Sequence, residues 1–144
     1  MRTLGIDYGT RRIGLAISDE LGMIAMARET LHIQSVKEAV QRVSEAVVES
    51  EASCVVVGLP LNMDGSRGRM VEEVEAFVSK LKELVPIPVE TWDERLSSQM
   101  AERTLLEADM SREKRKRVLD KMAAQAILQG WLDAHSDPMD FPEP

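Results

Sequence analysis

Cysteine, histidine and aromatic residues are scarce in this sequence, which has one cysteine, two histidines and 3% aromatic residues in 144 positions. A single cysteine cannot form a disulfide within the chain, so Cys54 is predicted to be a reduced core residue of a cytoplasmic protein. His32 and His135 are far from each other and from Cys54 in the sequence. The sequence therefore offers no histidine and cysteine cluster that would bind a metal ion.

Long apolar runs are also absent. The sequence has no stretch of about 18 apolar residues and no basic segment followed by an apolar one at its start, so it predicts neither a membrane span nor a signal peptide. Its 44% apolar and 30% charged residues are ordinary for a globular protein. We expect one domain over residues 1–135, followed by a disordered acidic tail at 136–144.

Negative charge predominates, with a net charge of -7, but the charges are unevenly distributed. Residues 111–122 contain six basic and two acidic side chains, a local charge of +4, and the rest of the chain carries -11. Phosphate neutralisation dominates nucleic-acid binding, so the total charge argues against a polyanionic partner. The basic segment still allows a polyanion to be bound locally.

Hydrophobic periodicity predicts the element order β-β-β-α-β-α-β-α. Strands are expected at 2–8, 12–18, about 23–33, 54–57 and 89–92. Helices are expected between Ser35 and Glu51, from about Val71 to Leu84 and from about Arg112 to Asp133, with a further helical stretch at about 98–108. Short connections make the first three strands an antiparallel meander. The pattern predicts an α/β domain with a mixed five-stranded sheet and helices on both faces.

Two of these helices carry more specific signals. Ser35, with Glu38 three residues later, is a capping box that begins the first helix. The last helix is expected to turn one apolar face inward, formed by Leu119, Met122, Ala123, Ala126, Ile127 and Trp131.

The first strand ends in Asp7, and a tight turn follows it. Gly9 and Gly14 remove side chains where a phosphate or another strand can approach closely. Arg11 and Arg12 lie between these glycines and can combine with the turn amides in an anion site. The turn can therefore hold a metal ion or a phosphate.

Three carboxylates from distant parts of the chain can converge in this topology: Asp7 at the end of a strand, Glu94 just after another, and Asp120 on the last helix. Such a cluster is stable only if it binds cations or protons. Hard oxygen ligands suit Mg²⁺ or Mn²⁺. Two such ions about 4 Å apart can activate a water and stabilise the leaving oxygen of a phosphodiester.

Structural explanations exist for two of these acids and for the basic run. Asp7 can form an Asx turn with the residues after it. Asp120 follows Lys116 and Arg117 by one helical turn and can form an exposed ion pair. The basic run 112–117, taken alone, is typical of a solvated helix start. Its position one turn before Asp120 favours a functional role.

Structural explanations also exist for the acids after the last strand. Glu94 can pair with Arg95 or Arg67 at the surface. Asp93 can cap the turn that follows it instead of binding a metal. The pattern leaves open which of the two acids faces Asp7.

With these residues assembled, the sequence resembles the YqgF/RuvX family, whose members are described as nucleases with an RNase H-like fold related to Holliday-junction resolvases. The resemblance covers about residues 2–133 and rests on four blocks in the same order: Leu4–Gly14, Val57–Ser66, Trp92–Ser98 and Asp120–Gln129. An Asp-x-Gly turn alone would be weak support. Four blocks at fitting spacing are specific.

The resemblance implies an RNase H-like core in which Asp7, Glu94 and Asp120 are the catalytic acids and hold two Mg²⁺ or Mn²⁺ ions. Related nucleases usually carry an acid at the end of the strand where this chain has Gly58-Leu59-Pro60. The sequence departs from them there. The Asp93-Glu94 pair would have to supply that ligand, which makes Glu94 a less direct assignment than Asp7.

The substrate implied by the resemblance is structured nucleic acid. The 5′ end of precursor 16S ribosomal RNA, within pre-ribosomal particles, is the first expectation and a branched DNA junction is the alternative. The low aromatic content favours recognition of shape and backbone over base stacking. Oligomeric state stays open. The residues expected to contact the substrate are Arg11, Arg12, Asn62, Arg95, Arg115, Lys116, Arg117 and Lys121, with Asp64 beside Asn62.

Two other function classes are compatible with parts of the sequence. Asp-x-Gly-Thr after a strand also begins the phosphate loop of actin-like and sugar-kinase ATPases, but those proteins close two such domains over ATP. This chain has length for one. A nuclease fold that keeps its acids can also serve as a non-catalytic nucleic-acid or ribosome-assembly module.

Overall fold

A computed structural model describes residues 1–62, 64–95 and 111–135, apart from the side chains of residues 112, 113 and 115–121. The elements follow the predicted order: β1 (Thr3–Tyr8), β2 (Arg12–Ser18), β3 (Ala25–His32), α1 (Val36–Ser50), β4 (Cys54–Leu59), α2 (Arg69–Leu84), β5 (Val89–Asp93) and α4 (Arg112–His135). The helical stretch expected at 98–108 and the tail expected at 136–144 lie outside the described residues.

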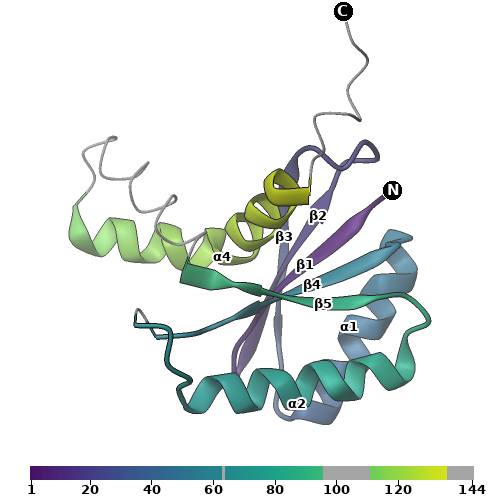
Figure 1. Ribbon diagram of the computed structural model, residues 1–144, viewed down its shortest axis with the longest axis horizontal. Helices are drawn as coiled ribbons and strands as arrows, with labels where there is room; N and C mark the ends of the chain where they lie inside the picture. The colour runs from purple at the N-terminus through teal and green to yellow at the C-terminus, as the bar shows by residue number, and fades with distance from the viewer. Residues whose placement is uncertain (63, 96–110, 136–144) are drawn as a thin grey trace, which may run out of the picture.

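The five strands form one sheet in the order β3-β2-β1-β4-β5, with β1 in the centre. β1 pairs antiparallel with β2, and β2 pairs antiparallel with β3, which confirms the predicted meander. β4 is parallel to β1 and β5 is parallel to β4. Figure 1 shows α1 and α2 on one face of this sheet and α4 on the other. The predicted mixed sheet with helices on both faces is confirmed.

The main core lies between the sheet and the helices α1 and α2. Alternate residues of β1 and β4 point into it, among them Leu4, Ile6 and Val57. The predicted capping box begins α1, because the Ser35 hydroxyl accepts the Glu38 N–H at 3.1 Å. With one face of each interior strand in this core, Gly5 and Asp7 of β1 are left on the face that α4 covers.

The face under α4 has short side chains, and the helix lies very close to it. A Cβ added at Gly5 would lie 2.7 Å from Leu128 Cβ and 3.2 Å from the Ala124 carbonyl oxygen. Gly5 therefore acts as a seat for the helix, and Ala16 and Ala25 of β2 and β3 extend this contact. No described helix is long and apolar enough to cross a membrane.

The inward face of α4 differs from the predicted one. Ile127 is buried as expected, but Met122, Ala123, Ala126 and Trp131 are only partly buried, and Leu119 lies outside the described side chains. The buried positions are Ala124, Ile127, Leu128 and Leu132. The prediction was wrong about Ala123 and Ala126 because it followed the apolar period of the helix alone, which does not contain the contacts of the helix with the sheet. The glycine-lined strand instead accepts the small Ala124 and the adjacent Leu128 at close range.

Replacement of Gly5 by alanine is expected to destabilise the fold by about 1–3 kcal/mol, the usual cost of overpacking a filled core. The reason is that Leu128 Cβ is fixed to the helix backbone and cannot rotate away. Urea denaturation of the Gly5→Ala and Gly14→Ala variants would measure the effect. At Gly14 the nearest atoms lie at 3.5 Å and 3.6 Å, which is ordinary contact, so this variant is the matched control. Equal losses in the two variants would contradict this account of the helix seat.

Candidate active site

Asp7 lies at the carboxyl end of the central strand, in a row of residues that crosses the sheet. Its partner on β2 is Gly14. On β4 its neighbour is Gly58, one position beyond the last β1–β4 pair, and Gly58 is paired in turn with Trp92 of β5. Asp7 is thus flanked by a glycine on each neighbouring strand. Neither neighbouring strand therefore places a side chain of its own beside this carboxylate.

Glu94 follows β5 directly and reaches back over β4. A Cβ added at Gly58 would lie 2.7 Å from Glu94 Oε1 and 2.8 Å from its Cγ. The carboxylate of Glu94 therefore occupies the space above Gly58, beside Asp7. In the sequence, Gly58 stood out only as a position near which related nucleases carry an acid. No local pattern shows which side chain from another strand fills the space over a glycine.

The electrostatic environment of Glu94 is unfavourable to its ionised form. Burial is the main cause that raises its pKa, to about 8 from an ordinary 4.5, and the charge of Asp7 is the next. A hydrogen bond from protonated Glu94 to Asp7 and the charge of Asp93 add to the shift. Two carboxyl groups in one partly buried space need a proton or a cation between them. Their oxygen donors fit a hard divalent ion.

Asp120, the third predicted acid, is in α4, one helical turn before the buried Ala124. Its side chain lies outside the described residues, as do those of Arg115, Lys116 and Arg117. The same applies to Lys121. Among the described side chains, no group of three histidine, cysteine, aspartate or glutamate residues is placed to hold a metal ion. The structure therefore brings together two of the three predicted acids, and the position of the third stays a prediction.

Asp93 has the structural role that the sequence left open. Its carboxylate accepts the backbone N–H of Arg95 at 3.0 Å, as a cap of the turn after β5. The Arg95 guanidinium also binds it, with Nη2 2.6 Å from Oδ2. This hydrogen bonding lowers the pKa of Asp93. Glu94, not Asp93, is the acid placed beside Asp7, and Arg67, one of its two suggested surface partners, pairs with Glu75.

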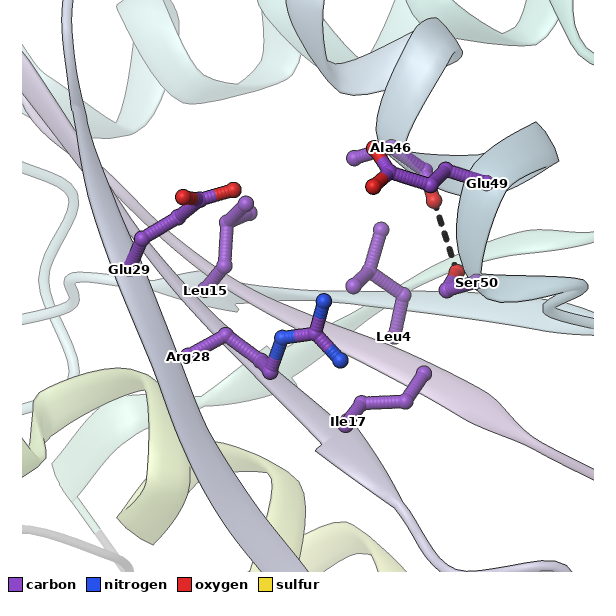
Figure 2. Close-up of a pocket in the computed structure, with 8 residues that line it drawn as sticks. All are labelled: Leu4, Leu15, Ile17, Arg28, Glu29, Ala46, Glu49 and Ser50. Carbon is purple, nitrogen blue, oxygen red and sulfur yellow. Dashed lines mark hydrogen bonds between the residues drawn. The ribbon is translucent and has the colours of Figure 1, made fainter.

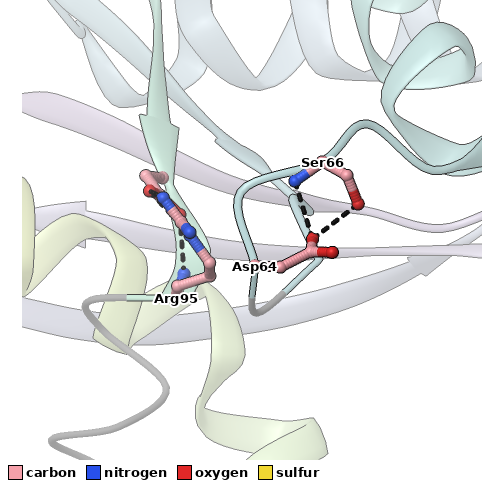
Figure 3. A network of polar contacts seen from close by, with 4 residues as sticks. Asp64, Ser66 and Arg95 are labelled. Atoms are coloured by element: carbon pink, nitrogen blue, oxygen red, sulfur yellow. Dashed lines mark hydrogen bonds and ion pairs between the residues drawn. The ribbon is translucent and has the colours of Figure 1, made fainter.

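The loop after β4 lies against Arg95 (Figure 3). Asp64 accepts hydrogen bonds from the backbone N–H and the hydroxyl of Ser66, at 2.8 Å and 2.6 Å, and these lower its pKa. The amide of Asn62 donates to the Ser66 hydroxyl at 2.9 Å. Gly65 adopts a φ of +87°, which favours glycine. Asn62 is thus held at the surface in this loop, and its contact with a substrate stays a prediction.

The predicted phosphate ligands of the first turn are exposed at the same end of the sheet. The turn closes through the Gly9 N–H, which donates to the Arg12 carbonyl at 3.0 Å. The Arg11 carbonyl accepts the Ile33 N–H at 2.9 Å, which ties the turn to the end of β3. Both arginine side chains are exposed and follow Asp7 closely in the chain. Their positions suit contacts with an anionic ligand.

A separate pocket lies away from Asp7 and Glu94 (Figure 2). Its floor is formed by Leu4, Leu15 and Ile17, which belong to the core under α1. Arg28 and Glu29 line it from β3. It lies on the face of the sheet opposite α4, so it is not part of the carboxylate site.

Comparison with known proteins gives one family and several relatives. The sequence model of the RuvX family, described as Holliday junction resolvase, matches residues 1–134. A Myxococcus xanthus protein named "Putative pre-16S rRNA nuclease" is 50% identical over 138 residues, which cover 96% of this chain and 91% of that protein.

Two solved structures show the same fold at low sequence identity. Thermus thermophilus RuvC in complex with Holliday junction substrate has a TM-score of 0.55 and 16% identity, and the match covers 93% of this chain and 94% of RuvC. A ROK hexokinase from the same organism has a TM-score of 0.50 and 18% identity, and the match covers 71% of this chain but 38% of the hexokinase.

The raised pKa of Glu94 predicts that metal-free protein loses stability as the pH rises from about 5 to 8. The folded protein keeps a proton on Glu94 that the unfolded chain releases above its ordinary pKa of 4.5, so higher pH favours unfolding. Melting temperatures of wild type and Glu94→Gln across this range would measure the effect. The wild type should fall by several degrees relative to the variant, whose neutral amide imitates the protonated acid. Parallel curves for the two proteins would refute this.

Proposed function

The chain belongs to the RuvX family, and from this premise we propose that it is a metal-dependent nuclease that hydrolyses phosphodiester bonds in structured nucleic acid. The observation that carries the proposal is the placement of Asp7 and Glu94 in one partly buried space at the carboxyl ends of the strands. Ligand sites of open α/β sheets form at this edge.

The substrate that we propose first is the 5′ end of precursor 16S ribosomal RNA, in a pre-ribosomal particle in the cytoplasm. Its support is the name of the Myxococcus xanthus relative, which covers nearly the whole chain at 50% identity. The acidic body of the protein favours a substrate that is bound locally, through the basic segment 111–122.

The cofactor that we propose is a pair of Mg²⁺ or Mn²⁺ ions held by Asp7, Glu94 and Asp120. Two carboxyl groups share one space, where burial and then the charge of Asp7 raise the pKa of Glu94, and such a pair fits a divalent cation better than a monovalent one. Bound ions of this kind supply an activated water and stabilise the leaving oxygen. The position of Asp120 one turn before Ala124, which packs over Gly5 and Gly14, supports it as the third ligand.

The remaining site residues would bind and orient the nucleic acid. Arg11 and Arg12, exposed in the turn after Asp7, would contact phosphates. Arg95 is held by Asp93, so its guanidinium would approach a phosphate from a preset position. Asn62 would orient the backbone from the adjoining loop. The basic side chains of α4 would supply attraction that does not depend on sequence.

Holliday-junction cleavage is the second candidate. It is favoured by the description of the family model and by the fold shared with RuvC, whose solved structure contains a junction substrate. A four-way junction presents two equivalent strands, so this function would require a symmetric dimer. A non-catalytic binding module is the outcome if the acids do not support turnover.

The nuclease proposal predicts metal-dependent cutting of an end-labelled precursor-rRNA fragment, tested beside a four-way DNA junction. Asp7→Asn and Glu94→Gln should each lower the rate by more than about 100-fold, because even changes behind a metal ligand cost 10–100-fold. EDTA should abolish cutting. Glu49→Gln, an exposed acid on the opposite face of the sheet, is the control and should match wild type. Binding of folded, metal-loaded protein to either substrate without cutting would indicate the binding module instead.

The proposed role of the α4 basic side chains predicts a change in salt dependence. Lys116→Gln should weaken binding to all substrates alike and reduce the slope of log affinity against log salt by about 1, the value for one phosphate contact. Filter binding at several salt concentrations would measure it. Lys82→Gln, at the last turn of α2, serves as the control. An unchanged slope for Lys116→Gln would remove this residue from the interface.

A further inference from the structure

Gly58 is a glycine whose backbone does not require one. Among the described residues, the glycines with positive φ are Gly22 and Gly65, so Gly58 has a conformation open to other residues. Alanine at a compatible site normally stabilises a protein by about 0.4–1 kcal/mol, because it restricts the unfolded chain. The reason for glycine must therefore be the space beside it.

That space is filled by two side chains from different elements. A Cβ at position 58 would lie 2.5 Å from Ile127 Cδ1 of α4, in addition to its contacts of 2.7 Å and 2.8 Å with Oε1 and Cγ of Glu94. Ile127 Cδ1 is the end of a flexible chain and can move. Glu94 is constrained, because its carboxyl group is hydrogen-bonded to Asp7 and the next residue, Arg95, is tied to Asp93.

We propose that Gly58 is a positioning residue, which leaves its place on β4 empty so that the carboxylate of Glu94 can reach across from β5 to Asp7. The expected effect on metal binding rests on the proposed function. The positioning of Glu94 itself is inferred from the contacts at Gly58. Any side chain at position 58 would displace Glu94 from Asp7. The position of the Glu94 carboxylate thus depends on a residue that has no side chain.

Gly5 and Gly58, which both lie under α4, allow a controlled test. A Cβ at Gly5 meets only α4, at Leu128 and Ala124, whereas a Cβ at Gly58 meets Glu94 as well. Gly5→Ala therefore reproduces the effect on helix packing without touching the acids. Ile127→Val removes the Cδ1 atom, so Gly58→Ala in that background isolates the contact with Glu94 and keeps the experiment usable if the single variant folds poorly.

The first measurement is a double-mutant cycle of melting temperatures with Gly58→Ala and Glu94→Ala, in the Ile127→Val background. Because Glu94→Ala removes both Cγ and Oε1, Gly58→Ala should cost several degrees when Glu94 is present and much less when it is absent. Equal losses in the two backgrounds would overturn the proposal. This cycle needs no metal ion and no substrate.

The second measurement is Mn²⁺ binding by calorimetry to folded wild type, Gly58→Ala and Gly5→Ala. Gly58→Ala should weaken binding by about tenfold or more, as expected when a ligand loses its support, while Gly5→Ala stays within about twofold of wild type. Unchanged affinity in Gly58→Ala, or equal loss in both variants, would overturn the proposal. If wild type binds no Mn²⁺, the proposed cofactor fails, and the stability cycle still decides the role of Gly58.

Discussion

Repulsion between Asp7 and Glu94 is the constraint around which this end of the fold is arranged. The two acids come from β1 and from the residue after β5, two strands apart in the sheet, and meet in a partly buried space where burial and the charge of Asp7 raise the pKa of Glu94. A folded chain that holds two such groups together gives up stability near neutral pH. The surrounding contacts must supply that stability.

Those contacts come from both faces of the sheet. α1 and α2 cover a core of aliphatic residues, and the central strand contributes Leu4 and Ile6 to it. On the other face α4 lies on Gly5, with Leu128 and Ala124 at the closest approach. The same close approach leads the helix past Asp7 and Gly58, so the packing that stabilises the sheet also sets the wall of the carboxylate site.

The sequence predicted most of the fold because strand and helix periods are local properties. It also identified Asp7, which ends a strand in a distinctive turn. It did not establish whether Asp93 or Glu94 faces Asp7, because the two acids are adjacent at the end of β5. They are distinguished by the hydrogen bond that Asp93 accepts from the Arg95 N–H, which the sequence does not show. The inner face of α4 was misplaced for a related reason: the contact of Gly5 with Ala124 and Leu128 decides which side of the helix faces the sheet, and an apolar pattern does not contain that contact. Contacts between distant residues decided both cases.

The position of Arg95 explains why its positive charge does not lower the pKa of Glu94. Arg95 is the residue after Glu94, yet its guanidinium binds Asp93. The pKa of Glu94 is raised by its burial and by the two acids Asp7 and Asp93. An arginine bound to Glu94 would favour its ionised form and would lower its pKa. Because Arg95 binds Asp93 instead, it does not favour the ionised form of Glu94. A site arranged in this way favours a cation from solution over an internal ion pair.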